Sequence, residues 1–139
     1  MPQKAINELG PLQAQVMDLL WQMGEATVRA VQSALAEDRP EDEAPAYTTV
    51  LTTMQKLQKA GWLTFRREGR AYVYRPARSR DEEGGSALKR LVDDAFRGDA
   101  MAAVLQLLAA EDLGDAELDR LQRMVDEARR SREAKETGR

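Results

Sequence analysis

Polar and basic side chains gather in one stretch of the chain, between Ala46 and Arg80. Its first part, YTTVLTTMQKLQK, holds four threonines and two lysines, and its second part carries arginines on both sides of a Glu-Gly pair. Residues 46–80 contain eight Lys or Arg and one Glu, a net charge of +7, whereas the whole chain carries −3 and the remainder therefore −10. Hydroxyl and cationic groups bind phosphates and form hydrogen bonds with base edges. This stretch therefore indicates a local site for a polyanion.

The chain contains neither histidine nor cysteine. It thus lacks the usual zinc ligands, a thiolate nucleophile and the usual general base near neutral pH. Because no nucleotide-binding glycine motif or catalytic triad is found either, we expect no enzyme, no metal and no cofactor. No apolar run approaches the ~18 residues of a membrane span, and the N-terminus lacks the apolar segment of a signal peptide. We expect a soluble cytoplasmic protein without membrane insertion.

Apolar spacing predicts three helices in the first half of the chain. Gly10-Pro11 begins the first helix and Gly24 ends it, as helix-terminal Gly and Pro commonly do. Thr27 is expected to cap the second helix, after a link with room for a strand of one or two residues. The third helix begins near Tyr47 and turns its apolar side inward, with Val50, Met54 and Leu57 at helical spacing. Gly61 is expected to end it.

A basic hairpin follows the third helix. Residues 62–67 and 70–75 predict two strands joined by a tight turn at Glu68-Gly69, with Leu63 and Phe65 facing the core. Upstream, the segment 37–45, EDRPEDEAP, predicts a solvated loop without helix or strand. The alternative for that loop is an acidic fence that repels phosphates in the wrong register.

After Arg80 the sequence predicts three amphipathic helices, which are too small to bury a core of their own. We expect their apolar stripes to pair with the same segment of a second chain, which gives a homodimer. The predicted dimer contacts are Leu88, Leu91, Phe96, Val104, Leu108, Leu118, Leu121 and Val125.

The predicted fold class is mainly α with a small β-wing. We expect a winged helix-turn-helix DNA-binding domain at 1–78, a three-helix dimerisation domain at 79–131 and a disordered tail at 132–139. The third helix of such a fold enters the major groove. The predicted DNA contacts on this helix are Tyr47, Thr48, Thr49, Thr52, Lys56 and Lys59, and those on the wing are Arg66, Arg67 and Arg70.

Structural roles compete with these assignments. Thr53 shares the side of Val50 and Met54, so we expect it to line the core. Tyr47 is alternatively a packing residue at the helix start. Tyr72 and Tyr74 are alternatively residues that stiffen the hairpin, and the wing arginines are alternatively a solvated hairpin tip.

Several stretches match one family in family order. They are VMDLLW at 16–21, AYTTVLTTMQKLQKAGWL at 46–63 and GRAYVYRP at 69–76, with weaker matches over 88–99 and 104–121. The sequence resembles the penicillinase and methicillin-resistance repressors (BlaI/MecI type), a family that also includes CopY-type copper repressors. The resemblance implies a homodimeric transcriptional repressor that binds a palindromic operator in double-stranded DNA. It places DNA contacts on Thr48, Thr49, Thr52, Lys56, Arg66, Arg67 and Arg70.

The resemblance also implies a route of inactivation. In the antibiotic-responsive members, a membrane sensor-protease signal leads to cleavage within the dimerisation region, and the corresponding bond here is Gln106–Leu107. Gln106 stands where the β-lactam-responsive members carry Asn. The CopY-type cysteine pairs are missing, which excludes copper sensing through thiolates. The rival function is a winged-helix protein-interaction module that docks an acidic partner without sequence-specific DNA binding.

Overall fold

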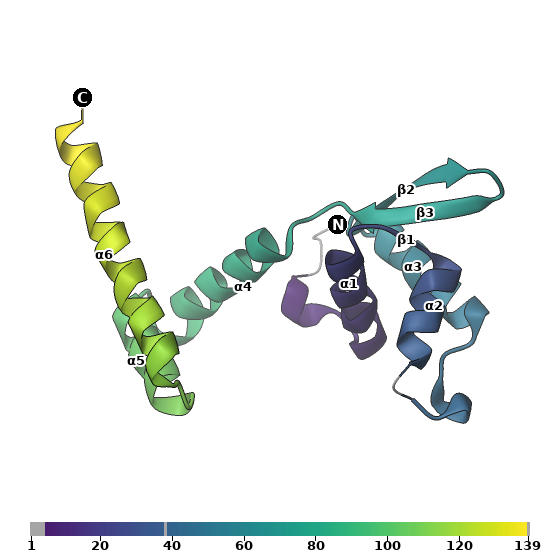
Figure 1. Cartoon of the computed structure of the whole chain (residues 1–139), viewed down its shortest axis with the longest axis horizontal. Coiled ribbons are helices and arrows are strands. Elements are labelled where there is room, and N and C mark those ends of the chain that lie inside the picture. The colour runs from purple at the N-terminus through teal and green to yellow at the C-terminus, as the bar shows by residue number, and fades with distance from the viewer. Residues whose placement is uncertain (1–4, 38, 139) are drawn as a thin grey trace. The chain divides into compact units, whose positions relative to one another are not determined.

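The computed structural model describes residues 5–37 and 39–138. They belong to two compact units, Met1–Leu91 and Val92–Arg139, whose boundary lies inside a helix. The elements of the first unit (Figure 1) are α1 (Pro11–Met23), β1 (Ala26–Thr27), α2 (Val28–Ala36), α3 (Tyr47–Lys59), β2 (Leu63–Glu68) and β3 (Ala71–Pro76). The helix α4 (Arg80–Ala95) crosses the boundary, and the second unit continues with α5 (Ala100–Ala110) and α6 (Asp115–Thr137). The predicted class, mainly α with a small wing, is confirmed.

The core of the first unit lies among α1, α2, α3 and the start of the hairpin. Its fully buried side chains come from all three helices and from the residues that follow α3. They are Val16, Met17, Leu20, Val31, Val50, Met54, Leu57, Trp62 and Leu63. Burying these apolar side chains supplies most of the free energy that holds α3 in place.

The helix ends follow the predicted signals. Gly10 precedes Pro11 at the start of α1, and the Thr27 Oγ1 accepts a hydrogen bond from the Ala30 amide at 3.1 Å. At the end of α3, Gly61 has φ +87°, and the Trp62 amide donates to the Leu57 carbonyl at 2.8 Å. This Schellman arrangement needs the left-handed backbone that Gly adopts without cost.

The sheet has the order β1-β3-β2, and both pairings are antiparallel. Glu68 pairs with Ala71, so the turn consists of Gly69 and Arg70, and the predicted turn at Glu68-Gly69 is wrong by one residue. Gly69 has φ +63°. A glycine of positive φ at the first turn position is typical of a type II′ hairpin turn, and the ladder therefore includes Glu68.

The prediction for Phe65 is right about its face of the sheet but wrong about its burial. Phe65 shares a face of the sheet with its cross-strand partner Tyr74, but 46% of Phe65 is exposed. The hairpin projects past the helices (Figure 1), so this position lies near the rim of the core. There Phe65 contacts other aromatic rings, with centroids 5.1 Å from Tyr72 and 5.6 Å from Tyr74. Tyr74 itself is buried in the core.

Two segments expected to lack regular structure contain helix. Glu41–Glu43 forms a short 3-10 helix within the acidic loop, directly after Pro40. The helix α6 continues through Thr137, although the sequence predicts disorder over 132–139. Residues 128–137 are rich in Ala, Arg, Glu and Lys, which favour helix, and Arg132 pairs with Glu136 at 3.7 Å one turn away. No helix within the described ranges combines the length and apolarity that crossing a membrane requires.

Candidate nucleic-acid interface

The third helix separates its side chains sharply into a buried and an exposed face. Val50, Met54 and Leu57 lie in the core, and Thr53 is only 9% exposed, as predicted. The Thr53 hydroxyl donates to the Thr49 carbonyl at 2.8 Å. The opposite face brings together the predicted contact residues, all exposed: Tyr47, Thr48, Thr49, Thr52, Lys56 and Lys59.

Threonine is a poor helix former because its branched side chain restricts χ1. The helix α3 nevertheless carries four threonines within Tyr47–Lys59. Packing of α1 and α2 against the buried face compensates for this weak propensity. The exposed Thr48, Thr49 and Thr52 add little to that packing, so their hydroxyl and methyl groups are available to a ligand.

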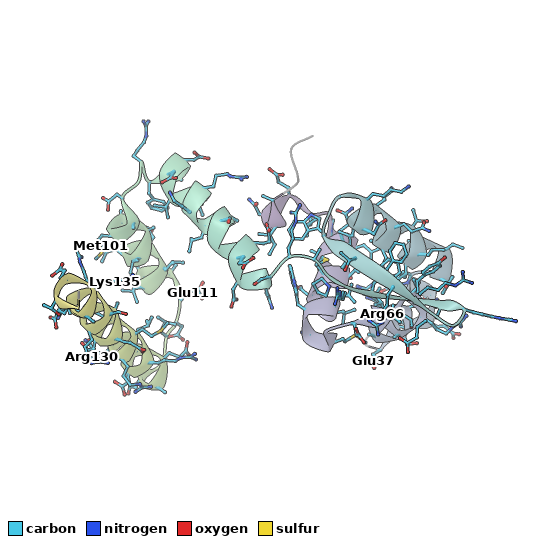
Figure 2. The ribbon with its side chains drawn as sticks, turned by 90° about the horizontal axis from the view of Figure 1, so that it is seen from above. Glu37, Arg66, Met101, Glu111, Arg130 and Lys135 are labelled. Carbon is cyan, nitrogen blue, oxygen red and sulfur yellow. The ribbon has the colours of Figure 1, made fainter. Side chains whose placement is uncertain are left out.

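The basic side chains of the wing differ in their partners. Arg66 on β2 (Figure 2) donates to both carboxylate oxygens of Glu25, at 2.6 and 2.9 Å, and to Glu68 at 3.0 Å. The hydrogen bond from Arg66 lowers the pKa of Glu25, and the Glu25 hydrogen bond raises the pKa of Arg66. Because Glu25 retains its charge below the ordinary carboxyl pKa, this link weakens only as the pH falls through the lowered value.

The other predicted cations lack such partners. Among the residues that the structure describes, Arg67 donates to the Gly69 carbonyl alone, at 3.2 Å. Within the described residues, no carboxylate forms an ion pair with Arg70, Lys56 or Lys59. An unpaired cation keeps its full attraction for a phosphate, whereas Arg66 must first give up Glu25.

Replacing Glu25 by Gln should therefore leave Arg66 with Glu68 as its remaining carboxylate partner and strengthen duplex binding. We expect a modest gain in affinity, with a salt slope that steepens by up to ~1 per bound chain because one more cation contacts a phosphate. Titrations of a duplex at several salt concentrations measure both quantities. A fall in affinity would instead show that the Glu25–Arg66 link positions the wing. Glu37→Gln, in the acidic loop after α2, is the charge-matched control.

Arg78 belongs to the basic stretch 46–80, but in the structure its side chain packs against other residues. Its guanidinium lies 4.4 Å from the ring centroid of Trp62, donates to the Ala60 carbonyl at 3.3 Å and pairs with Glu83 at 3.8 Å. Its side chain is only 11% exposed. The Arg78 carbonyl accepts a hydrogen bond from the Trp21 indole at 2.8 Å. These contacts tie the end of α3 to α1 and to the start of α4.

One cation next to the predicted contacts was missed from the sequence. Arg29, in the first turn of α2, places its guanidinium carbon 5.4 Å from the ring centroid of Tyr47. The acidic loop separates these two residues in the sequence, so no local pattern links them. Tyr47 is therefore more than a packing residue at the helix start, because it also supports an exposed cation. Over the described ranges, no group of three or more Asp or Glu is placed to hold a metal ion.

Comparison with known proteins gives relatives over most of the chain. The Transcriptional regulator BlaI of Mycobacterium tuberculosis, in two strains, is 36% identical over 124 residues, which is 88% of this chain and 86% of the relative. The solution structure of the DNA-binding domain of the repressor BlaI aligns with 57% of this chain and 92% of its own length, at 24% identity and a TM-score of 0.47. A homodimeric winged helix-turn-helix DNA-binding domain from Mycobacterium bovis aligns with 66% of this chain and 77% of its own length, at 30% identity and a TM-score of 0.44.

The match to a family is equally extensive. The family model described as Penicillinase repressor matches residues 9–127, which include every helix from α1 to α5 and more than half of α6. This confirms the resemblance seen in the sequence. The chain belongs to the penicillinase repressor family, a family of transcriptional repressors and not of enzymes.

Proposed function

We propose that the chain represses transcription as a homodimer on a palindromic operator, with α3 of each copy in a major groove. The observation that supports this most strongly is the division of α3, whose buried face is held by the core while its opposite face exposes hydroxyls and lysines. The projecting hairpin (Figure 1) carries arginines beside it. This is the geometry in which winged helices bind a groove and the adjacent backbone.

Residues along α3 would serve different purposes. Thr48, Thr49 and Thr52 lie in the first half of the helix, where recognition helices meet base edges, and their methyl groups suit the thymine methyl. Lys56 and Lys59 lie in the second half, suited to phosphates where the helix leaves the groove. On the wing, Arg67 and Arg70 would bind the backbone or enter the minor groove.

The second unit supports the dimer part of the proposal. Its α5 and α6 border a groove of about 780 Å³ that is lined mainly by leucine, valine and methionine. Exposed apolar side chains continue outside it, and Met101 (Figure 2) is 67% exposed. Stable monomers seldom leave so much apolar surface in water. The predicted dimer contacts Leu88, Leu91, Val104, Leu108, Leu118, Leu121 and Val125 are all exposed in the single chain, and Phe96 is half-buried.

Release from DNA by cleavage at Gln106–Leu107 belongs to the same proposal. Both residues lie inside α5, where the Leu107 carbonyl accepts a hydrogen bond from the Glu111 amide at 3.0 Å. Both are exposed. A protease needs an extended substrate, so α5 would have to unwind locally before a membrane sensor-protease system acted on this bond.

The proposal is tested by selecting bound duplexes from a random pool with the full chain. We expect enrichment of a palindrome, together with a steep fall of affinity with salt. Sedimentation of the protein on the selected duplex should show two chains. If no sequence is enriched at moderate salt, the repressor assignment fails and the rival reading, a protein-interaction module, is favoured.

Thr52 should read a single base pair. Changing Thr52 to Ala is expected to reduce discrimination at one position of each half-site by about 1 to 3 kcal/mol, while non-specific binding stays the same. Competition between the selected operator and single-base variants measures this effect. Thr137→Ala, at the end of α6 and outside the DNA-binding unit, is the matched control. Unchanged preference at every position would remove Thr52 from the base-reading residues.

A further inference from the structure

A small crevice lies between the wing and the beginnings of α2 and α3. It has a volume of about 280 Å³, and its polar lining consists of Thr27, Arg29, Tyr47, Arg70, Tyr72 and Tyr74. Three elements that are distant in the sequence therefore converge on one opening. Typical pockets for small organic ligands occupy ~300 to 1,000 Å³, so this crevice is slightly smaller than most of them.

The charge of the crevice is positive and uncompensated. Neither Arg29 nor Arg70 forms an ion pair with any carboxylate in the described part of the chain. Arg66 does not line the crevice, and its charge is neutralised by ion pairs with Glu25 and Glu68. Two arginines that line one opening, neither paired with a carboxylate of the described residues, favour a doubly coordinated oxyanion.

The rest of the lining is arranged to keep that charge. Arg29 lies over the ring of Tyr47 at 5.4 Å, a contact that restrains the guanidinium without cancelling its charge. A tyrosine is neutral at physiological pH, and burial raises the pKa of Tyr74 further, so this phenol adds no repulsion toward an anion. The first turn of α2, where Arg29 lies, also presents the positive end of a helix dipole.

We propose that this crevice clamps a single backbone phosphate of the bound duplex between Arg29 and Arg70. The clamp rests on the proposed function. A DNA strand that leaves the major groove occupied by α3 and runs toward the wing would pass the crevice between α2, α3 and the wing. The phosphate held here would fix the angle between α3 and the wing. Arg29 thereby becomes a phosphate contact outside both α3 and the wing.

Arg29→Gln should weaken binding to every duplex by about ten-fold and reduce the salt slope by ~1 per bound chain. Arg29→Lys should recover only part of the affinity, because an ammonium keeps the charge but not the planar fork. Arg39→Gln, after the other end of α2, removes the same charge away from the crevice and should leave binding unchanged. Circular dichroism confirms that each variant is folded.

An uncharged analogue of the backbone phosphate tests which phosphate Arg29 contacts. Methylphosphonate groups placed one at a time along the selected duplex should weaken wild-type binding at several positions. At the clamped position the loss should be clearly smaller in Arg29→Gln than in the wild type, because Arg70 is then the only arginine left on that phosphate. Additive losses at every position would overturn the clamp, as would Arg29-dependent competition by inorganic phosphate without coupling to any backbone position. In either case the wild-type preference for a palindrome remains, so failure of the clamp is distinct from failure of the repressor function.

Discussion

Leu121→Asp should convert the proposed dimer into monomers and lower affinity for the full palindrome by about 10²- to 10⁴-fold. The side chain lies on α6 and lines the apolar groove shared with α5. A carboxylate there would have to lose its hydration when the second chain covers the groove, at a cost that the interface cannot recover. Two winged helices that are no longer linked bind their half-sites independently, and the gain from bivalency is lost.

The half-site separates this effect from damage to the DNA-binding unit. Leu121 belongs to the unit Val92–Arg139, whereas α3 belongs to Met1–Leu91. Affinity for a single half-site should therefore stay within about two-fold of the wild type. Ser131→Asp, exposed on α6 and outside the groove, adds the same charge as a control. An intact dimer in sedimentation, or full palindrome affinity in a monomer, would contradict the prediction.

The elements that depend on local signals were predicted well from the sequence. Gly10-Pro11, the Thr27 cap and Gly61 each act through their own backbone conformation, so neighbouring residues suffice to recognise them. The exposed row on α3 follows from periodicity in the same way. Phe65 shows where such rules end, because strand alternation assigns a face but does not say how far the core extends beneath it.

The partners of charged residues required the fold. Arg66 and Arg70 look equivalent in the sequence, yet Glu25, which directly precedes β1, pairs with Arg66. No carboxylate in the described ranges pairs with Arg70. Arg29 reaches Tyr47 only because α2 and α3 pack side by side. A count of +7 over one stretch therefore overstates the charge that faces DNA, since Arg66 and Arg78 are paired with carboxylates. The same count misses Arg29, which lies outside the stretch.

Trp62 should be the residue in the first unit whose truncation costs the most stability. Its side chain is 0% exposed and follows directly after the glycine that ends α3. It packs edge-on against Trp21, at 6.3 Å between centroids, and Arg78 covers its ring. Trp62→Ala should lower the free energy of unfolding by about 3 to 5 kcal/mol, because burial is lost and a cavity remains. That is a large share of the ~5 to 15 kcal/mol typical of a domain.

Trp62→Phe should cost much less, about 1 to 2 kcal/mol, since an aromatic ring still fills most of the space. The indole Nε1 of Trp62 has no hydrogen-bond partner in the described part of the structure. Phenylalanine therefore removes an unsatisfied donor and breaks no hydrogen bond. Urea unfolding followed by circular dichroism measures both variants without relying on tryptophan fluorescence. Equal losses for Phe and Ala would contradict the prediction, because an aromatic ring at this position would then add nothing to stability. Half-site binding should follow the folded fraction, because Trp62 supports α3 from behind and does not face the duplex.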